Sequence, residues 1–158
     1  DVDFLVVGGG DRLEEAQAFA EKLGIRDQVT FTDKVPHRMV PKFIAAADVV
    51  VATFENNSQV LCKSPLKVIE YMSSGKAVVA SRVGEVINMV GDCGLLAEPD
   101  NSLEIAEKIG ILLDDQTLRK ELGARARQRA EKMYSWKNSA HTLVGAYYDA
   151  FKHHHAIV

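Results

Sequence analysis

The chain has 158 residues, of which 47% are hydrophobic and 26% charged, and its formal net charge is −3 at pH 7. This length fits one globular domain, and the 11 Gly, 4 Pro and 2 Cys exclude collagen-like, disordered and disulfide-scaffold classes. The mild negative charge argues against a nucleic-acid binder, and no apolar run approaches the roughly 18 residues of a membrane span.

Short apolar runs alternate with helical patterns along the chain. The predicted strands are residues 4–7, 29–31, 49–51, 77–80 and 94–96. The predicted helices are residues 11–23, 40–47, 64–73, 102–113, 117–133 and 136–151. The polar segment 53–63 has no clear period and is expected to be a loop.

This alternation predicts an α/β fold with a doubly wound parallel sheet, a Rossmann-like arrangement of three layers. We expect one domain over residues 1–152, followed by a tail at 153–158, and we interpret the histidine run in this tail as derived from an expression tag. Ligands of such sheets bind at the carboxyl ends of the strands. The candidate binding residues are therefore those that follow each predicted strand.

Three glycines follow the first predicted strand. A turn of this kind, with Gly9 and Gly10 before a helix, can place backbone N–H groups against a phosphate. The dinucleotide-binding fingerprint is incomplete, because its third glycine falls on Leu13, although Asp33 lies near the place of a ribose-binding acid. A tight turn without a ligand is the alternative.

The helix predicted from residue 64 begins at the carboxyl end of the third strand. Ser64 is expected to cap it and Pro65 to occupy its first position, so that Leu66 and Lys67 offer backbone N–H groups to a phosphate. The carboxylate of Glu70 can accept two hydrogen bonds from a ribose diol. The alternative for Glu70 is an exposed side chain that offsets Lys67 or Lys76.

Nearly the whole chain resembles the carboxyl-terminal, donor-binding domain of a group 1 glycosyltransferase with the GT-B fold. The resemblance rests on the order and spacing of residues 6–10, 35–41, 45–48, 64–67, 70–72, 75–79 and 135–136. It implies a nucleotide-sugar donor such as a UDP- or GDP-sugar, retention of anomeric configuration, and neither a cofactor nor a metal.

The resemblance also implies roles for single residues. Gly9 and Gly10 would lie beside the donor cleft, and Val35 and Val40 would flank the base. Ser64, Pro65, Leu66 and Lys67 would face the diphosphate and sugar, and Glu70 would hold the ribose hydroxyls. The resemblance assigns no catalytic residue.

Three departures from the family pattern stand out. The family pairs two glutamates, and the first of them, eight positions before Glu70, is Cys62 here, with Glu55 as a candidate substitute. Asp33 replaces a glycine that is usual after the second strand. The family also has a further strand and helix, and an acceptor-binding amino-terminal domain, before the first strand seen here. We therefore expect a fragment that is inactive alone.

Three other functions remain as alternatives. They are a sugar-nucleotide epimerase of the same architecture, an NAD(P)-binding oxidoreductase domain, and a non-catalytic module that binds a nucleotide sugar. The basic stretch 119–132 predicts a solvated helix surface, with a partner site or peripheral membrane association of the full-length enzyme as the alternative. Cys62 and Cys93 show no metal-ligand spacing, and two unpaired thiols favour a cytoplasmic protein over one with a disulfide.

Overall fold

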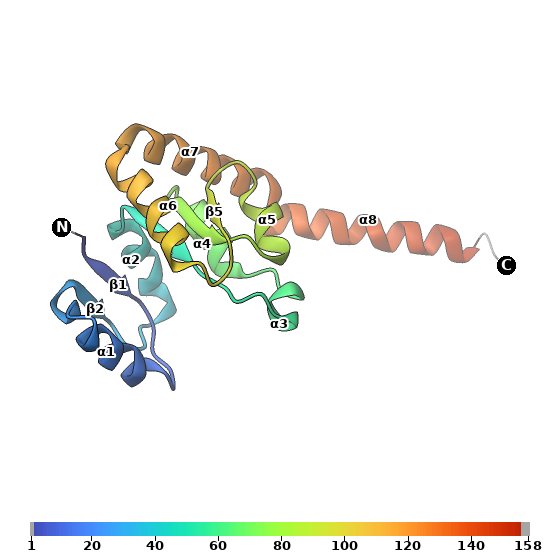
Figure 1. Ribbon diagram of the computed structural model, residues 1–158. Helices are drawn as coiled ribbons and strands as arrows, with labels where there is room; N and C mark the ends of the chain where they lie inside the picture. Colours follow the sequence, from blue (N-terminus) through green and yellow to red (C-terminus); the bar gives the residue numbers. More distant parts are fainter. Residues whose placement is uncertain (1, 156–158) are drawn as a thin grey trace. The chain divides into compact units, whose positions relative to one another are not determined.

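A computed structural model describes residues 2–155 and shows parallel strands with flanking helices (Figure 1). Strand β1 (Phe4–Val6) pairs with β2 (Val29–Phe31) in one sheet. Strands β3 (Val49–Ala52), β4 (Ala77–Ser81) and β5 (Leu95–Ala97) form a second sheet in that order. All pairs are parallel, so the predicted α/β class is confirmed. The chain divides into two compact units, Asp1–Ala47 and Asp48–Val158.

The first unit is built around the β1–β2 pair, in which Phe4 lies opposite Val29. Its helical elements are α1 (Leu13–Lys22), two short 3-10 segments (Arg26–Gln28 and His37–Met39) and α2 (Val40–Ala46). Pro41 lies in the first turn of α2. Backbone N–H groups have no intrahelical acceptor there, so the N–H that proline lacks costs the helix no hydrogen bond. The predicted order of elements in this unit is therefore present.

The second unit is organised around β4. Its helices are α3 (Ser58–Leu61), α4 (Leu66–Ser73), α5 (Gly84–Val90), α6 (Ser102–Asp114), α7 (Gln116–Met133) and α8 (Trp136–His155). All five side chains of β4 are buried, although successive side chains of a strand point to opposite faces. Helices therefore cover both faces of this strand. On one face, Ala77 and Val79 pack against Leu112 of α6 and Leu122 of α7.

Four details of the second unit differ from the prediction. The expected loop 53–63 contains α3, because the Asn57 side chain caps it by accepting a hydrogen bond from the Val60 N–H (3.0 Å). Helix α4 begins at Leu66 with Pro65 at its N-cap, so Ser64 does not cap it. Helix α5 was not predicted, and α8 continues through His155. Residues 156–158 of the predicted tail lie outside the described residues.

The basic stretch 119–132 lies on α7, and two of its arginines form hydrogen bonds with the ends of other helices. The stretch is therefore only in part a solvated surface. Arg119 donates hydrogen bonds to the carbonyl oxygens of Leu112 and Leu113, at the end of α6. Arg129 donates to the carbonyl oxygens of Asn88 and Met89, near the end of α5. A guanidinium at a helix C-terminus satisfies carbonyl groups that the helix itself leaves without donors. Among residues 2–155, no helix combines the length and apolar character that crossing a membrane requires.

Candidate functional site

The amino-terminal end of α4 is open to solvent and positively charged. In the described part of the chain, no side chain caps its first turn, in which Leu66 and Lys67 are exposed. Their N–H groups precede the first intrahelical hydrogen bond, which the N–H of Val68 makes to the Pro65 carbonyl (3.0 Å). The helix dipole and the Lys67 ammonium add positive charge at the same place. This helix end can therefore bind an anion such as a phosphate.

The segment that follows β3 is attached to the end of β4. The Phe54 N–H donates a hydrogen bond to the Ser81 hydroxyl oxygen (2.9 Å), and Ser81 is only 1% exposed. The Phe54 ring then lies under the Lys67 ammonium, with Nζ 5.4 Å from the ring centroid. This distance is within the range of cation–π attraction. The ends of two adjacent strands and the start of α4 are thus connected through Phe54.

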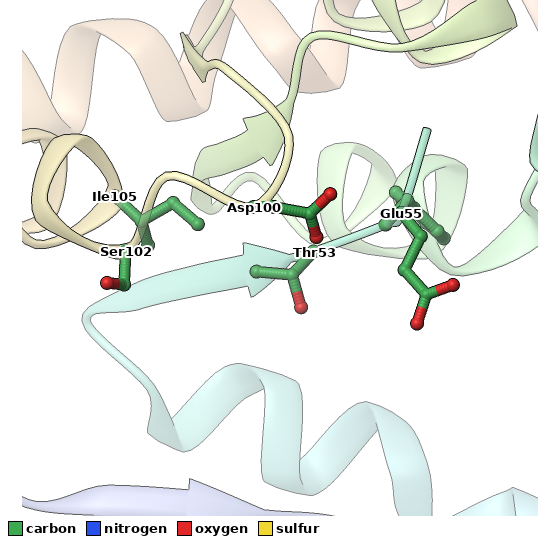
Figure 2. A pocket seen from close by; sticks show the side chains of 6 residues that line it. Thr53, Glu55, Asp100, Ser102 and Ile105 are labelled. Carbon is green, nitrogen blue, oxygen red and sulfur yellow. The ribbon is translucent and has the colours of Figure 1, made fainter. Parts of the chain in front are cut away.

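A cavity of about 300 Å³ lies beside this segment. It is lined by Thr53, Phe54, Glu55, Asp100, Ser102 and Ile105. Figure 2 shows Thr53 and Glu55 on the segment that leaves β3, Asp100 on the segment that leads into α6, and Ser102 and Ile105 on the first turn of α6. The cavity therefore presents two carboxylates and two hydroxyl groups, at the carboxyl ends of β3 and β5, where ligands of parallel sheets bind.

Glu70 lies one turn after Lys67 on α4 and is half-buried. Burial raises the pKa of the neighbouring Tyr71 hydroxyl, and the negative charge of Glu70 raises it further. Residues three positions apart share one face of a helix, so Lys67 and Glu70 both project from the same side of α4. A cation and a carboxylate on one face match a ligand that carries both phosphate and hydroxyl groups.

The segment between β3 and α4 holds one departure from the family pattern, Cys62, and its candidate substitute, Glu55. Cys62 is exposed at the C-cap of α3 and carries a free thiol. Glu55 is also exposed, and one of its carboxylate oxygens accepts a hydrogen bond from the side-chain amide of Asn57 (3.0 Å). Because Asn57 also caps α3, it connects Glu55 to the start of that helix. Whether Glu55 replaces the family glutamate stays a prediction.

In the first unit, the glycine turn lies against the residue after β2. A Cβ atom at Gly9 would clash with Oδ1 of Asp33 and lie 3.1 Å from the Lys34 backbone nitrogen, so any larger residue would have to displace the Asp33 side chain. Asp33 has a left-handed backbone (φ 55°), a conformation that glycine adopts most easily. Gly8 and Asp33 also form an isolated antiparallel bridge. The turn is therefore shaped by its contact with Asp33.

We expect Gly9→Ala to lower the free energy of unfolding by about 1–3 kcal/mol, the usual cost of overpacking. In an Asp33→Gly background the same change should cost less, because the nearest clashing atom is gone. Chemical denaturation of the four proteins in this double-mutant cycle measures the coupling. Equal costs in both backgrounds would show that the Asp33 contact does not shape the turn.

The predicted site residues fall into two groups. Ser64, Pro65, Leu66, Lys67 and Glu70 lie together on α4 and the residues before it. In the first unit, Gly9 and Gly10 follow β1, whereas Val35 follows β2 and Val40 begins α2; both valines are half-buried. Sequence reasoning missed Phe54 and Ser81. Ser81 ends β4 and Phe54 is the second residue after β3. Their place at the carboxyl ends of adjacent strands was the signal that could have found them.

The described residues offer no ready metal site. Among residues 2–155, no three His, Cys, Asp or Glu side chains lie close enough together to hold a metal ion. The groups that could bind a charged ligand at α4 are backbone N–H groups and the Lys67 ammonium.

Residues 1–115 match the family model described as "Glycosyl transferases group 1". A D-inositol 3-phosphate glycosyltransferase from Xylanimonas cellulosilytica is 31% identical over an alignment of 158 positions, which covers 96% of this chain and 36% of that protein. An MMP alpha-(1->4)-mannosyltransferase from Mycolicibacterium hassiacum is 31% identical over 131 residues, covering 80% of this chain and 30% of that protein. The chain thus spans about one third of the length of these relatives.

Two solved structures have the same fold. Sucrose-phosphate synthase from Thermosynechococcus elongatus superimposes with a TM-score of 0.82 at 26% identity, over 94% of this chain and 38% of that one. HepE from Anabaena, in complex with UDP and glucose, gives a TM-score of 0.77 at 25% identity, over 91% of this chain and 41% of that one. Both comparisons extend across most of this chain.

Proposed function

The chain belongs to the group 1 glycosyltransferases, and from this we propose that it is the donor-binding part of a longer enzyme that uses a nucleotide sugar. The observation that carries the proposal is the uncapped, exposed start of α4, with Lys67 and Glu70 on one helix face. Two further facts support it: the family match includes this segment, and a solved structure of the same fold is a complex with UDP and glucose.

Each group at α4 has a role in this proposal. The N–H groups of Leu66 and Lys67 and the Lys67 ammonium bind the diphosphate, and Glu70 accepts hydrogen bonds from the ribose. The diphosphate gains negative charge as the glycosidic bond breaks, so donors that are already in place stabilise the transition state more than the ground state. We propose that the transfer retains the anomeric configuration and needs no metal, and that another part of the full-length protein binds the acceptor.

Nucleotide binding tests this proposal on the full-length protein. We expect UDP, GDP or ADP, alone or as a sugar conjugate, to raise the melting temperature, and NAD to leave it unchanged. A ligand present at 100 times its dissociation constant stabilises the folded state by about 2.7 kcal/mol, which a thermal melt detects.

The same titrations distinguish the alternatives. A shift with NAD alone would contradict the proposal and favour an oxidoreductase. Binding of a sugar nucleotide without transfer to any acceptor would favour a non-catalytic module. Conversion of the bound sugar to its epimer would favour an epimerase. For an active enzyme, nuclear magnetic resonance of the first product formed shows whether the anomeric configuration is retained.

A further inference from the structure

We propose that Phe54 and Ser81 are positioning residues that hold the Lys67 ammonium where it meets the donor diphosphate. This inference rests on the proposed function, because it assigns to Lys67 the role given above. It adds two residues to which the proposed function gives no contact with the ligand. Both act through a single side chain, that of Lys67.

The backbone of Phe54 is attached to the sheet through Ser81. Ser81 ends β4 and is 1% exposed, and it is the one polar side chain that is fully buried in the described chain. Its hydroxyl oxygen accepts the Phe54 N–H at 2.9 Å. A buried acceptor with a single backbone partner fixes that partner firmly, because an unpaired N–H would be costly there. The backbone of Phe54 is thus set by the end of the neighbouring strand.

The side chain of Phe54 contacts Lys67. The ring is half-buried, and the exposed Lys67 places Nζ 5.4 Å from its centroid. A free lysine side chain samples many rotamers, and binding a phosphate would have to order it. The ring face limits this freedom before the ligand arrives. The entropy lost when the diphosphate binds is therefore smaller.

The partner of the Lys67 ammonium is an aromatic ring and not a carboxylate. A carboxylate would neutralise the ammonium and compete with the phosphate, whereas an aromatic ring has no formal charge. The ring contacts the ammonium on one side and leaves N–H donors on its other side for an anion. Phe54 thus orients Lys67 without reducing its attraction for the diphosphate.

The test measures binding of UDP, GDP and ADP, and of the matching nucleosides, to the full-length protein by calorimetry. Phe54→Leu keeps the apolar bulk but removes the aromatic face. We expect it to weaken binding of the preferred diphosphate about two- to five-fold, which corresponds to about 0.5–1 kcal/mol, the range of an exposed cation–π contact. Binding of the nucleoside should not change, because it has no phosphate for Lys67 to meet.

Further variants separate positioning from general damage to the fold. Phe54→Tyr should restore diphosphate affinity, and Ser81→Ala should weaken it with no further loss in the Phe54→Leu background. In a Lys67→Met background, Phe54→Leu should have no effect. Two matched controls should bind as the unchanged protein does: Phe31→Leu, which removes the contact between Phe31 and Arg26 (5.5 Å), and Ser135→Ala, whose hydroxyl accepts the Asn138 N–H (3.2 Å).

The outcomes distinguish this inference from the proposed function. If the unchanged protein binds a diphosphate and Phe54→Leu binds it equally well or more tightly, the positioning role is wrong and the proposed function stands. Equal losses for the nucleoside and the diphosphate would also overturn the positioning role, because they indicate general damage. If no diphosphate binds the unchanged protein, both proposals are wrong.

Discussion

Replacing Gly123 with alanine should lower the free energy of unfolding by about 1–3 kcal/mol or more, as overpacking of a rigid site does. Gly123 is buried on α7, and a Cβ atom there would lie 2.3 Å from the carbonyl oxygen of Gly75 and 3.1 Å from its carbon. Both obstacles are backbone atoms, so no side-chain rotation relieves the clash. Alanine would therefore push α7 away from the end of α4 and from β4, which α7 also contacts.

Gly110 supplies the matched control for this experiment. It also lies within a helix, α6, but a Cβ atom there would meet nothing within 4 Å. Alanine is the better helix former, so Gly110→Ala should raise the free energy of unfolding by about 0.5–1 kcal/mol. Denaturation of the full-length variants, followed by circular dichroism, compares the two. Equal effects would show that helix propensity, and not the contact with Gly75, decides the result at residue 123.

Replacing Glu70 with alanine should weaken binding of a nucleoside diphosphate about 10- to 100-fold. This loss corresponds to about 1.4–2.7 kcal/mol, which is the usual contribution of one hydrogen bond to a charged acceptor. Glu55→Ala is the matched comparison, since Glu55 is an exposed glutamate that lies before α3 and not on α4. Its effect on the affinity for the free diphosphate should be much smaller. Similar losses in both variants would remove Glu70 from the ribose role.

A ligand that lacks a ribose hydroxyl makes the test specific. The unchanged protein should bind the 2′-deoxy form of the preferred diphosphate more weakly than the ribose form. In Glu70→Ala this preference should shrink or disappear, because the acceptor that distinguishes the two ligands is absent. A preference of unchanged size would place the ribose hydroxyls against another residue.

The order of elements could be predicted because its signals are local. Four apolar residues before a glycine turn, or three successive valines at 49–51, indicate a strand without reference to the rest of the chain. The burial that such runs also predict is wrong for β1, whose residues are all exposed. Similarly, the serine and proline before Leu66 indicate a helix start at the end of a strand, where ligands of parallel sheets bind. The position of the α4 segment in the candidate site therefore followed from neighbouring residues alone.

The residues that were missed depend on contacts between distant parts of the chain. Ser81 and Phe54 are 27 positions apart, and Arg129 reaches carbonyl groups 40 and 41 positions earlier. From the sequence alone, Gly123 is recognised only as a weak helix former. Its close contact with Gly75, which is distant in the sequence, is seen only in the structure. Helix α3 has four residues, too few for a periodic pattern, and its capping by Asn57 becomes visible only in three dimensions.

The two thiols differ in a way that makes the molecule easy to label at one point. Cys93 is 5% exposed, and burial together with its hydrogen bond to Asp92 raises its pKa, which keeps it protonated and slow to react. Cys62 is exposed and lies five positions before Lys67. A thiol-directed fluorophore would therefore attach to this part of the protein at Cys62. The residue that departs from the family pattern thus gives a spectroscopic reporter beside the start of α4.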